Sequence, residues 1–302
     1  MPFTPQEATL QVTANTFDVS SLKEQYNRVI ANDLQKIGVA GEMYYDSKGK
    51  VSFRPDFNLK PIVKFPHRKD DNLHGAIVIF EPPYKTEIED IIPKNLYIVC
   101  HDPYAQGKSA SATSLGAAYV IKVPNNISKP DDIIVASYVG RPQTQDDYNR
   151  NLFMLAEYYN AKIGFENDRG EVIAYAKRFR KMHVLQEEFE MLDKRDLRSK
   201  TVKRQYGMHM TEQRKAQGEL YIRDWLVSGR GANEDGDITL NMHKIYDPAL
   251  LLELIKFNRN GNFDRAMAFM IGMYHTRELY NKELKFDDHD NSKNDWFEKN
   301  YN

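Results

Sequence analysis

The sequence predicts an α/β protein with a central mixed β-sheet flanked by helices. Between residues 96 and 139, three short apolar segments follow one another, each bounded by turn residues, which is the pattern of a three-stranded meander. Beyond them, segments with apolar residues at helical spacing alternate with a further short apolar segment. A meander followed by helix, strand and helix is typical of a sheet with helices packed on its faces.

The predicted strands are short and largely apolar, as suits strands that are buried in a sheet. They are residues 96–100 (LYIVC), 115–123 (LGAAYVIKV), 133–139 (IIVASYV) and 162–166 (KIGFE). An earlier strand-like segment, residues 75–80 (GAIVIF), ends at Glu81-Pro82-Pro83 because proline cannot continue a strand ladder.

Capping residues mark the starts of two predicted helices. Thr144 is a good N-cap, with Asp147 three residues later, and apolar residues at helical spacing follow it. Asp247-Pro248 is a second start, because an N-cap residue is followed by proline in the first turn. Further helices are predicted over residues 21–36, 172–180, 211–227 and 264–280.

Composition restricts the class of protein. The chain has 302 residues, 41% of them hydrophobic and 28% charged, which is typical of a soluble globular protein. The formal charge of −1 neither requires nor excludes nucleic acid, because binding depends on where positive charge lies. The only cysteine, Cys100, excludes an intrachain disulfide and a cysteine-rich zinc site. No apolar segment approaches the roughly 20 residues of a membrane span, and no signal peptide is recognisable, so a cytoplasmic protein is expected.

Three parts are expected along the chain. Residues 1–90 are irregular in pattern, and they are predicted to form an N-terminal extension or connector wrapped on the main domain. The main domain is expected to comprise residues 91–283. Residues 284–302 are polar and acidic, and they are predicted to form a flexible tail.

Three carboxylates stand at the ends of predicted elements. Asp102 directly follows the strand LYIVC, Glu166 closes the strand KIGFE, and Asp264 opens the last predicted helix. Sites in open α/β sheets gather at the carboxyl ends of strands, so these side chains could converge. Converging carboxylates repel one another unless a cation neutralises them, and oxygen ligands suit Mg²⁺ or Mn²⁺. Two such ions would serve the in-line displacement of a phosphodiester.

Structural roles could equally explain each acid. Asp102 could cap a turn before Pro103, Glu166 could pair with Arg169, and Asp264 could be a helix N-cap. The spacing of the residues does not choose between these interpretations. His101 is expected to be packed rather than a ligand, because adjacent strand residues point to opposite faces, and Cys100 is expected in the core.

Three segments resemble the nuclease domain of large terminase subunits from tailed phages. Residues 96–118 (LYIVCHDPYAQGKSASATSLGAA) resemble the family's first catalytic strand, which ends in Asp-Pro. Residues 159–170 (YNAKIGFENDRG) resemble the second motif, and residues 262–274 (NFDRAMAFMIGMY) the third, in which an Asp opens a helix. Residues 138–159 resemble versions from crAss-like phages of gut Bacteroides. The likeness extends loosely from about residue 90 to 280.

The resemblance implies an RNase H-like endonuclease that cuts concatemeric viral double-stranded DNA during genome packaging. Carried over to this sequence, Asp102, Glu166 and Asp264 become catalytic ligands of two Mg²⁺ or Mn²⁺ ions, with Asp168 as a weaker fourth candidate. The implied partners are double-stranded DNA, read with little sequence specificity, and, through the full-length motor, the portal protein and small terminase subunit. The implied location is the host bacterial cytoplasm and, transiently, the portal vertex of the procapsid.

The chain departs from the family in lacking the ATPase motor. Gly107-Lys108-Ser109 mimics the end of a phosphate-binding loop, but Asp102 occupies the position of the loop's leading glycine. No ATPase activity is therefore expected. Residues 1–90 are interpreted as the connector from a missing ATPase domain.

A basic segment is the candidate DNA-binding region. It could contact phosphates without reading bases, or it could be a solvated surface loop. Its candidate residues are Lys194, Arg195, Arg198, Lys200, Lys203, Arg204, Arg214 and Lys215. Two other functions remain open: another RNase H-like nuclease of the resolvase or transposase type, and a non-catalytic adaptor that binds DNA or the portal.

Overall fold

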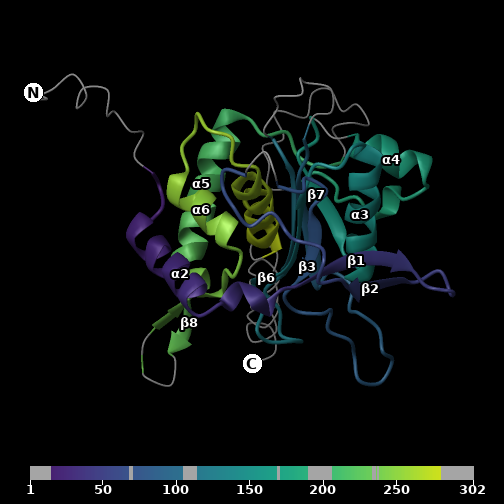
Figure 1. The fold of residues 1–302 in the computed structure, drawn as a ribbon, viewed down its shortest axis with the longest axis horizontal. Coiled ribbons are helices and arrows are strands. Elements are labelled where there is room, and N and C mark those ends of the chain that lie inside the picture. The colour runs from purple at the N-terminus through teal and green to yellow at the C-terminus, as the bar shows by residue number, and fades with distance from the viewer. Residues whose placement is uncertain are drawn as a thin grey trace, which may run out of the picture.

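The computed structural model describes residues 15–67, 71–104, 114–168, 171–189, 206–232, 236 and 238–279. Its centre is a seven-stranded sheet in the order β2-β1-β3-β6-β5-β4-β7 (Figure 1). The strands are β1 (Val39–Tyr45), β2 (Val51–Pro55), β3 (Ala76–Ile79), β4 (Tyr97–Asp102), β5 (Gly116–Lys122), β6 (Ile133–Gly140) and β7 (Lys162–Phe165). β4 and β7 pair in parallel, and the other neighbours pair antiparallel.

The order of the central strands confirms the predicted fold class. β4, β5 and β6 form the antiparallel meander, and helix α3 (Gln145–Tyr158) then returns the chain so that β7 pairs with the outer side of β4. The other helices are α2 (Val19–Ala31), α4 (Val172–Arg178), α5 (Glu212–Val227), α6 (Pro248–Lys256) and a last helix described over residues 264–279, with short turns η1 (Leu34–Ile37), η2 (Met182–Val184) and η5 (Asn241–Lys244). This mixed α/β sheet flanked by helices is consistent with an RNase H-like fold.

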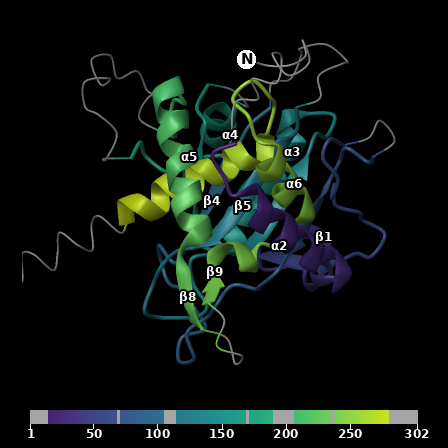
Figure 2. The ribbon, with the colours of Figure 1, turned by 90° about the vertical axis from the view of Figure 1, so that its left-hand side faces the viewer.

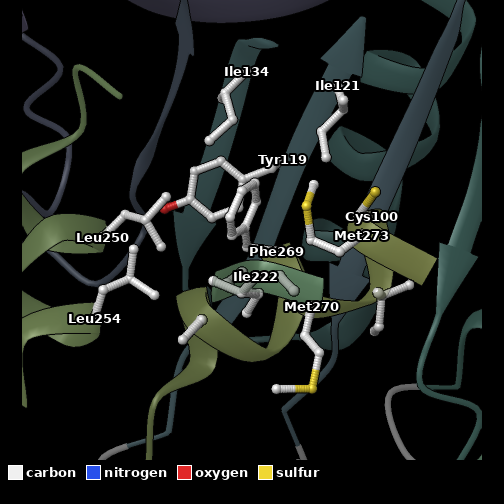
Figure 3. Close-up of a cluster of buried hydrophobic side chains, with 14 of the residues drawn as sticks. Cys100, Tyr119, Ile121, Ile134, Ile222, Leu250, Leu254, Phe269, Met270 and Met273 are labelled. Carbon is white, nitrogen blue, oxygen red and sulfur yellow. The ribbon is translucent and has the colours of Figure 1, made fainter. Parts of the chain in front are cut away.

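Helices cover both faces of the sheet. α3 and α4 lie on one face, and α2, α5, α6 and the helix over residues 264–279 lie on the other (Figures 1 and 2). Strand residues alternate between the two cores, so Val99 joins Phe153 on the α3 face while Cys100 joins Phe269 on the opposite face. Figure 3 shows Cys100 and Tyr119 pointing from the sheet into the second core. The sheet is therefore buried on both faces at its centre.

Local capping signals begin the helices where they were predicted. The Thr144 hydroxyl accepts the Asp147 N–H at 3.1 Å, and the Thr211 hydroxyl accepts the Arg214 N–H at 3.2 Å. The Asp247 carboxylate accepts the Ala249 N–H at 2.9 Å, ahead of Pro248 in the first turn of α6. Each bond satisfies a first-turn donor that the helix itself leaves without a partner, which confirms these predicted starts.

The first ninety residues contribute more regular structure than the sequence predicted. β1 and β2 form a hairpin, and β1 pairs with β3, which pairs with β6. Three strands from the predicted extension thus belong to the central sheet, although the boundary at residue 90 itself stays a prediction. A small second sheet joins β8 (Gly229–Ala232) to β9 (Ile238–Leu240). Within the described ranges, no helix has the length and apolar character needed to cross a membrane.

Candidate active site

Asp102 and Glu166 are placed together by the parallel pairing of β4 with β7. Cys100 is in register with Gly164 and His101 with Phe165, and the Glu166 N–H donates to the His101 carbonyl at 3.2 Å. Each acid is the residue after one of these paired positions, so Asp102 and Glu166 lie side by side at the carboxyl ends of adjacent strands. Cys100 and Gly164 face the core that includes the last helix. Side chains two positions apart in a strand point to the same face, so Asp102 and Glu166 point to that face too.

Asp264 reaches this edge from the last helix. Gly272 allows the helix to approach the sheet closely, because a Cβ there would lie 2.3 Å from Ile121 Cδ1 and 2.9 Å from Cys100 Sγ. At the start of the helix, the Asp264 carboxylate accepts the Leu115 N–H at 2.8 Å and the Ser114 hydroxyl at 2.9 Å. The start of the helix is thereby fastened to the chain that enters β5.

The three predicted acids line one pocket of about 190 Å³. Asp102 and Asp264 are 8% and 7% exposed, whereas Glu166 is half-buried. Each acid comes from a different part of the chain, and no local interaction requires them to meet. The remaining lining residues are Lys215, Glu219, Phe257, Asn258, Arg259, Gly261, Asn262, Phe263 and Met267.

Burial disfavours negative charge in this pocket. It raises the pKa of Asp264, and the hydrogen bonds from the Leu115 N–H and the Ser114 hydroxyl oppose that shift. Positive charge is present nearby, since Lys215 lines the same pocket and Arg259 forms a two-point ion pair with Glu219 at 2.9 and 3.0 Å. A desolvated carboxylate in a pocket that two further acids line is a group that a cation would stabilise.

The donor chemistry fits a hard divalent cation, which prefers carboxylate oxygens. Among the residues with described positions, however, no three His, Cys, Asp or Glu side chains are close enough together to hold one ion. The Asp264 carboxylate accepts hydrogen bonds from Ser114, Leu115 and Asn262. Carboxylate oxygens keep further lone pairs, so the same group could accept these bonds and also bind a cation.

Asp168, the weaker fourth candidate, pairs with His209. Its Oδ2 is 2.6 Å from His209 Nδ1, and the residue does not line the pocket. The alternative partner proposed for Glu166, Arg169, lies outside the described residues, as does Gly107-Lys108-Ser109.

The predicted DNA-binding residues fall into three groups. Lys215 lines the pocket and pairs with Glu212 at 3.2 Å. Arg214 is buried, where it donates to the His209 carbonyl at 2.8 Å and lies 3.6 Å from Glu188, so its guanidinium faces protein. The other candidates, Lys194, Arg195, Arg198, Lys200, Lys203 and Arg204, lie outside the described residues.

His101 and Cys100 are packed, as predicted. His101 Nδ1 lies 2.9 Å from the Ala117 carbonyl, and its ring stacks on Tyr148 with centroids 5.1 Å apart. Burial lowers the pKa of His101 to about 4 and raises the pKa of the Cys100 thiol. A neutral imidazole and a protonated thiol are thus structural groups beside the site.

Ser114, Asn262 and Arg259 are site residues that the sequence did not reveal. Ser114 and Asn262 contact Asp264 directly, and Arg259 lines the pocket. Serine and asparagine are common in turns, so these residues carry no signal that separates a ligand-positioning role from a turn. Their position on either side of Asp264 becomes visible only when β5 and the last helix are brought together.

No family model matches this chain, and no curated protein matches it. Among solved structures, the chain is similar to the crystal structure of the large terminase nuclease from thermophilic phage G20c. The match has a TM-score of 0.34 and 14% sequence identity, and it covers 70% of this chain and 90% of that one.

Proposed function

We propose that this protein is a metal-dependent endonuclease that cleaves concatemeric viral double-stranded DNA during genome packaging, as the nuclease part of a large terminase. The observation that carries the proposal is the common pocket of Asp102, Glu166 and Asp264. These acids come from two strand ends and one helix start, which is the placement that the sequence motifs predict. Among the described residues that line this pocket there is no serine or cysteine, which fits hydrolysis by water.

The three acids share one part in the proposed reaction, which is to bind the metal ions. Asp102, Glu166 and Asp264 would hold Mg²⁺ or Mn²⁺, with Asp264 oriented by Ser114 and Leu115. Two such ions would activate a water and would stabilise the leaving oxygen of an in-line displacement. The protein's own contribution is to fix the carboxylates on rigid elements at the sheet edge.

Among the predicted DNA-binding residues with described positions, Lys215 is the one that lines the acid pocket. It lines the acid pocket from α5, and its side chain is 37% exposed. A lysine there would contact a phosphate without reading bases, which suits cleavage with little sequence specificity. We extend the DNA-binding role to Lys194, Arg195, Arg198, Lys200, Lys203 and Arg204 on their basic character alone.

The packaging role rests on the resemblance of residues 96–118, 159–170 and 262–274 to terminase nuclease motifs. It makes the portal protein and the small terminase subunit proposed partners through a full-length motor. The proposed site of action is the host cytoplasm and the portal vertex. ATP hydrolysis is proposed to be absent from this chain, since Asp102 stands where a phosphate-binding loop needs glycine.

The test is cleavage of supercoiled plasmid with Mg²⁺, with Mn²⁺ or with EDTA. Wild-type protein is expected to nick and linearise the plasmid only with metal, and Asp102→Ala is expected to lose the activity. Asp146→Asn is the matched control, because Asp146 is an exposed acid of α3 that pairs with Arg178 away from the pocket. Cleavage that persists in Asp102→Ala would refute the site.

Substrate choice separates the proposed function from its rivals. A resolvase-type enzyme would prefer branched junctions, and a transposase-type enzyme would prefer its own element ends, so each is compared with linear duplex of the same length. An adaptor would bind DNA yet cleave none of these substrates with either metal. Preferential cleavage of ordinary duplex is the result expected here.

A further inference from the structure

The helix that begins at Asp264 has no N-cap side chain of its own. The Met267 N–H donates to the carbonyl of Phe263 at 2.9 Å, which makes Phe263 the N-cap residue. A phenylalanine side chain cannot accept hydrogen bonds from the N–H groups of the first turn, as Ser, Thr, Asp or Asn would. The first turn therefore depends on an acceptor from another part of the chain.

Glu253 of α6 supplies that acceptor. Its Oε2 accepts the backbone N–H groups of Arg265 at 2.8 Å and Ala266 at 3.0 Å. Its Oε1 accepts the Arg265 guanidinium at 2.9 Å, and both side chains are 1% exposed. A carboxylate at a helix N-terminus is also favoured by the helix dipole. One buried acid thus holds the residues that directly follow Asp264.

Arg265 fastens the same turn to other elements. Its Nη2 donates to the Ile62 carbonyl at 2.5 Å, and its Nε lies 3.9 Å from Asp247 Oδ2. Asp247 in turn accepts the Tyr119 hydroxyl of β5 at 2.6 Å. The first turn of the last helix is therefore tied to α6, to the sheet and to the segment before β3.

Because Glu253 accepts the first-turn N–H groups, the Asp264 side chain is not needed to cap its own helix. Its oxygens accept from Ser114, Leu115 and Asn262 beside the pocket, while Glu253 serves the N–H groups of the helix. We infer that Glu253 and Arg265 are positioning residues for Asp264, because they set where the helix starts and hence where its carboxylate lies in the pocket that Asp102 and Glu166 also line. This inference rests on the proposed metal site, and it assigns to a fully buried ion pair a role in metal affinity.

The experiment measures Mn²⁺ affinity by titration, following the electron paramagnetic resonance signal of free Mn²⁺, at a temperature where each variant is folded. Glu253→Gln keeps the size of the side chain but loses its charge, and its Mn²⁺ affinity is expected to fall about ten-fold, as for residues that orient metal ligands. A double variant, E253M/R265M, replaces the ion pair by apolar side chains of similar size. It is expected to fold even if Glu253→Gln does not, because the Arg265 charge is removed together with that of Glu253 while Asp247 keeps its hydrogen bonds from Tyr119 and the start of α6, and to bind Mn²⁺ as weakly.

Lys122→Met is the matched control. Lys122 is also 1% exposed and pairs with Glu81 at 2.7 Å, but it lies at the end of β5 remote from Ser114. The Lys122→Met variant is expected to unfold at a lower urea concentration than wild type without a change in Mn²⁺ affinity. This result would separate a loss of stability from a loss of positioning.

The outcomes distinguish this inference from the proposed function. If wild-type protein and all variants fail to bind Mn²⁺, the metal site is refuted and the inference with it. If wild-type protein binds and Asp264→Ala does not, while Glu253→Gln and E253M/R265M bind as wild type, the metal site stands and the positioning role is refuted. A ten-fold loss in both Glu253 variants with none in Lys122→Met supports it.

Discussion

Asp264 accepts the backbone N–H of Leu115 at 2.8 Å, so the first residue of the last helix is bound to the chain that enters β5. The bond places a buried carboxylate beside the ends of β4 and β7, where Asp102 and Glu166 already lie. In the sequence, Asp264 looks like an ordinary helix start. In the fold, it is the third acid that lines the pocket.

Asp264→Asn is expected to abolish metal-dependent cleavage while leaving the free energy of unfolding in EDTA within about 1 kcal/mol of wild type. The amide loses one accepted hydrogen bond, but it also removes a charge that burial disfavours, and the two effects oppose each other. Urea unfolding in EDTA and plasmid cleavage in Mn²⁺ measure the two quantities. Full activity together with a large loss of stability would mean that Asp264 is only a structural cap.

Mg²⁺ or Mn²⁺ is expected to raise the midpoint of thermal unfolding of the wild-type protein, because an ion that binds only the folded state stabilises it. EDTA should reverse the shift, and Asp102→Asn should show little of it. Asp168→Asn should keep most of the shift, since Asp168 faces His209 and not the pocket. A shift lost equally in both variants would restore Asp168 as a ligand.

Lys215→Ala is expected to weaken DNA binding roughly equally for all sequences and to lower the slope of log affinity against log salt by about one. The reason is that Lys215 would neutralise a single phosphate at the pocket. Lys36→Ala is a suitable comparison, because Lys36 is 72% exposed and pairs with Asp33 within the η1 turn. Fluorescence anisotropy of a labelled duplex at several salt concentrations provides both slopes, and equal slopes for the two variants would remove Lys215 from the interface.

Gly272→Ala is expected to destabilise the fold by about 1–3 kcal/mol, as overpacking of a closely packed core does. The added Cβ would meet Ile121 Cδ1 at 2.3 Å and Cys100 Sγ at 2.9 Å. Because the helix must then move away from the sheet, cleavage should also fall, through displacement of Asp264. A circular dichroism melt and a plasmid assay check both effects, with Gly229→Ala as comparison, since the nearest atom there is 3.7 Å away.

Stability should fall on acidification because of His101. Burial lowers its pKa in the folded state to about 4, whereas an unfolded histidine titrates near pH 6.5. As the pH falls below 6.5, the unfolded chain gains a proton that the folded chain does not. This difference removes about 2 kcal/mol between pH 7 and pH 5. Urea unfolding of wild type and His101→Phe at both pH values, in EDTA, should show a smaller pH dependence for the variant; equal dependence would exclude His101 as its source.

The elements whose signals are local could be predicted from the sequence alone. Apolar segments predicted β4 to β7, capping residues predicted the starts of α3 and α6, and three acids at element ends predicted part of the lining of the pocket. Such signals extend over one helical turn or one strand, so neighbouring residues suffice to express them. The metal-ligand role of the acids is still a prediction.

Which elements meet is set by tertiary packing. Packing placed strands β1, β2 and β3 in the central sheet, buried Arg214 against protein, and paired Asp168 with His209. It also brought Glu253 to the start of a helix that its own sequence leaves uncapped. Strand pairing and buried ion pairs depend on the partner's position as much as on the residue itself. The position of the partner is fixed by packing between segments far apart in the chain, and a local sequence pattern does not contain that information.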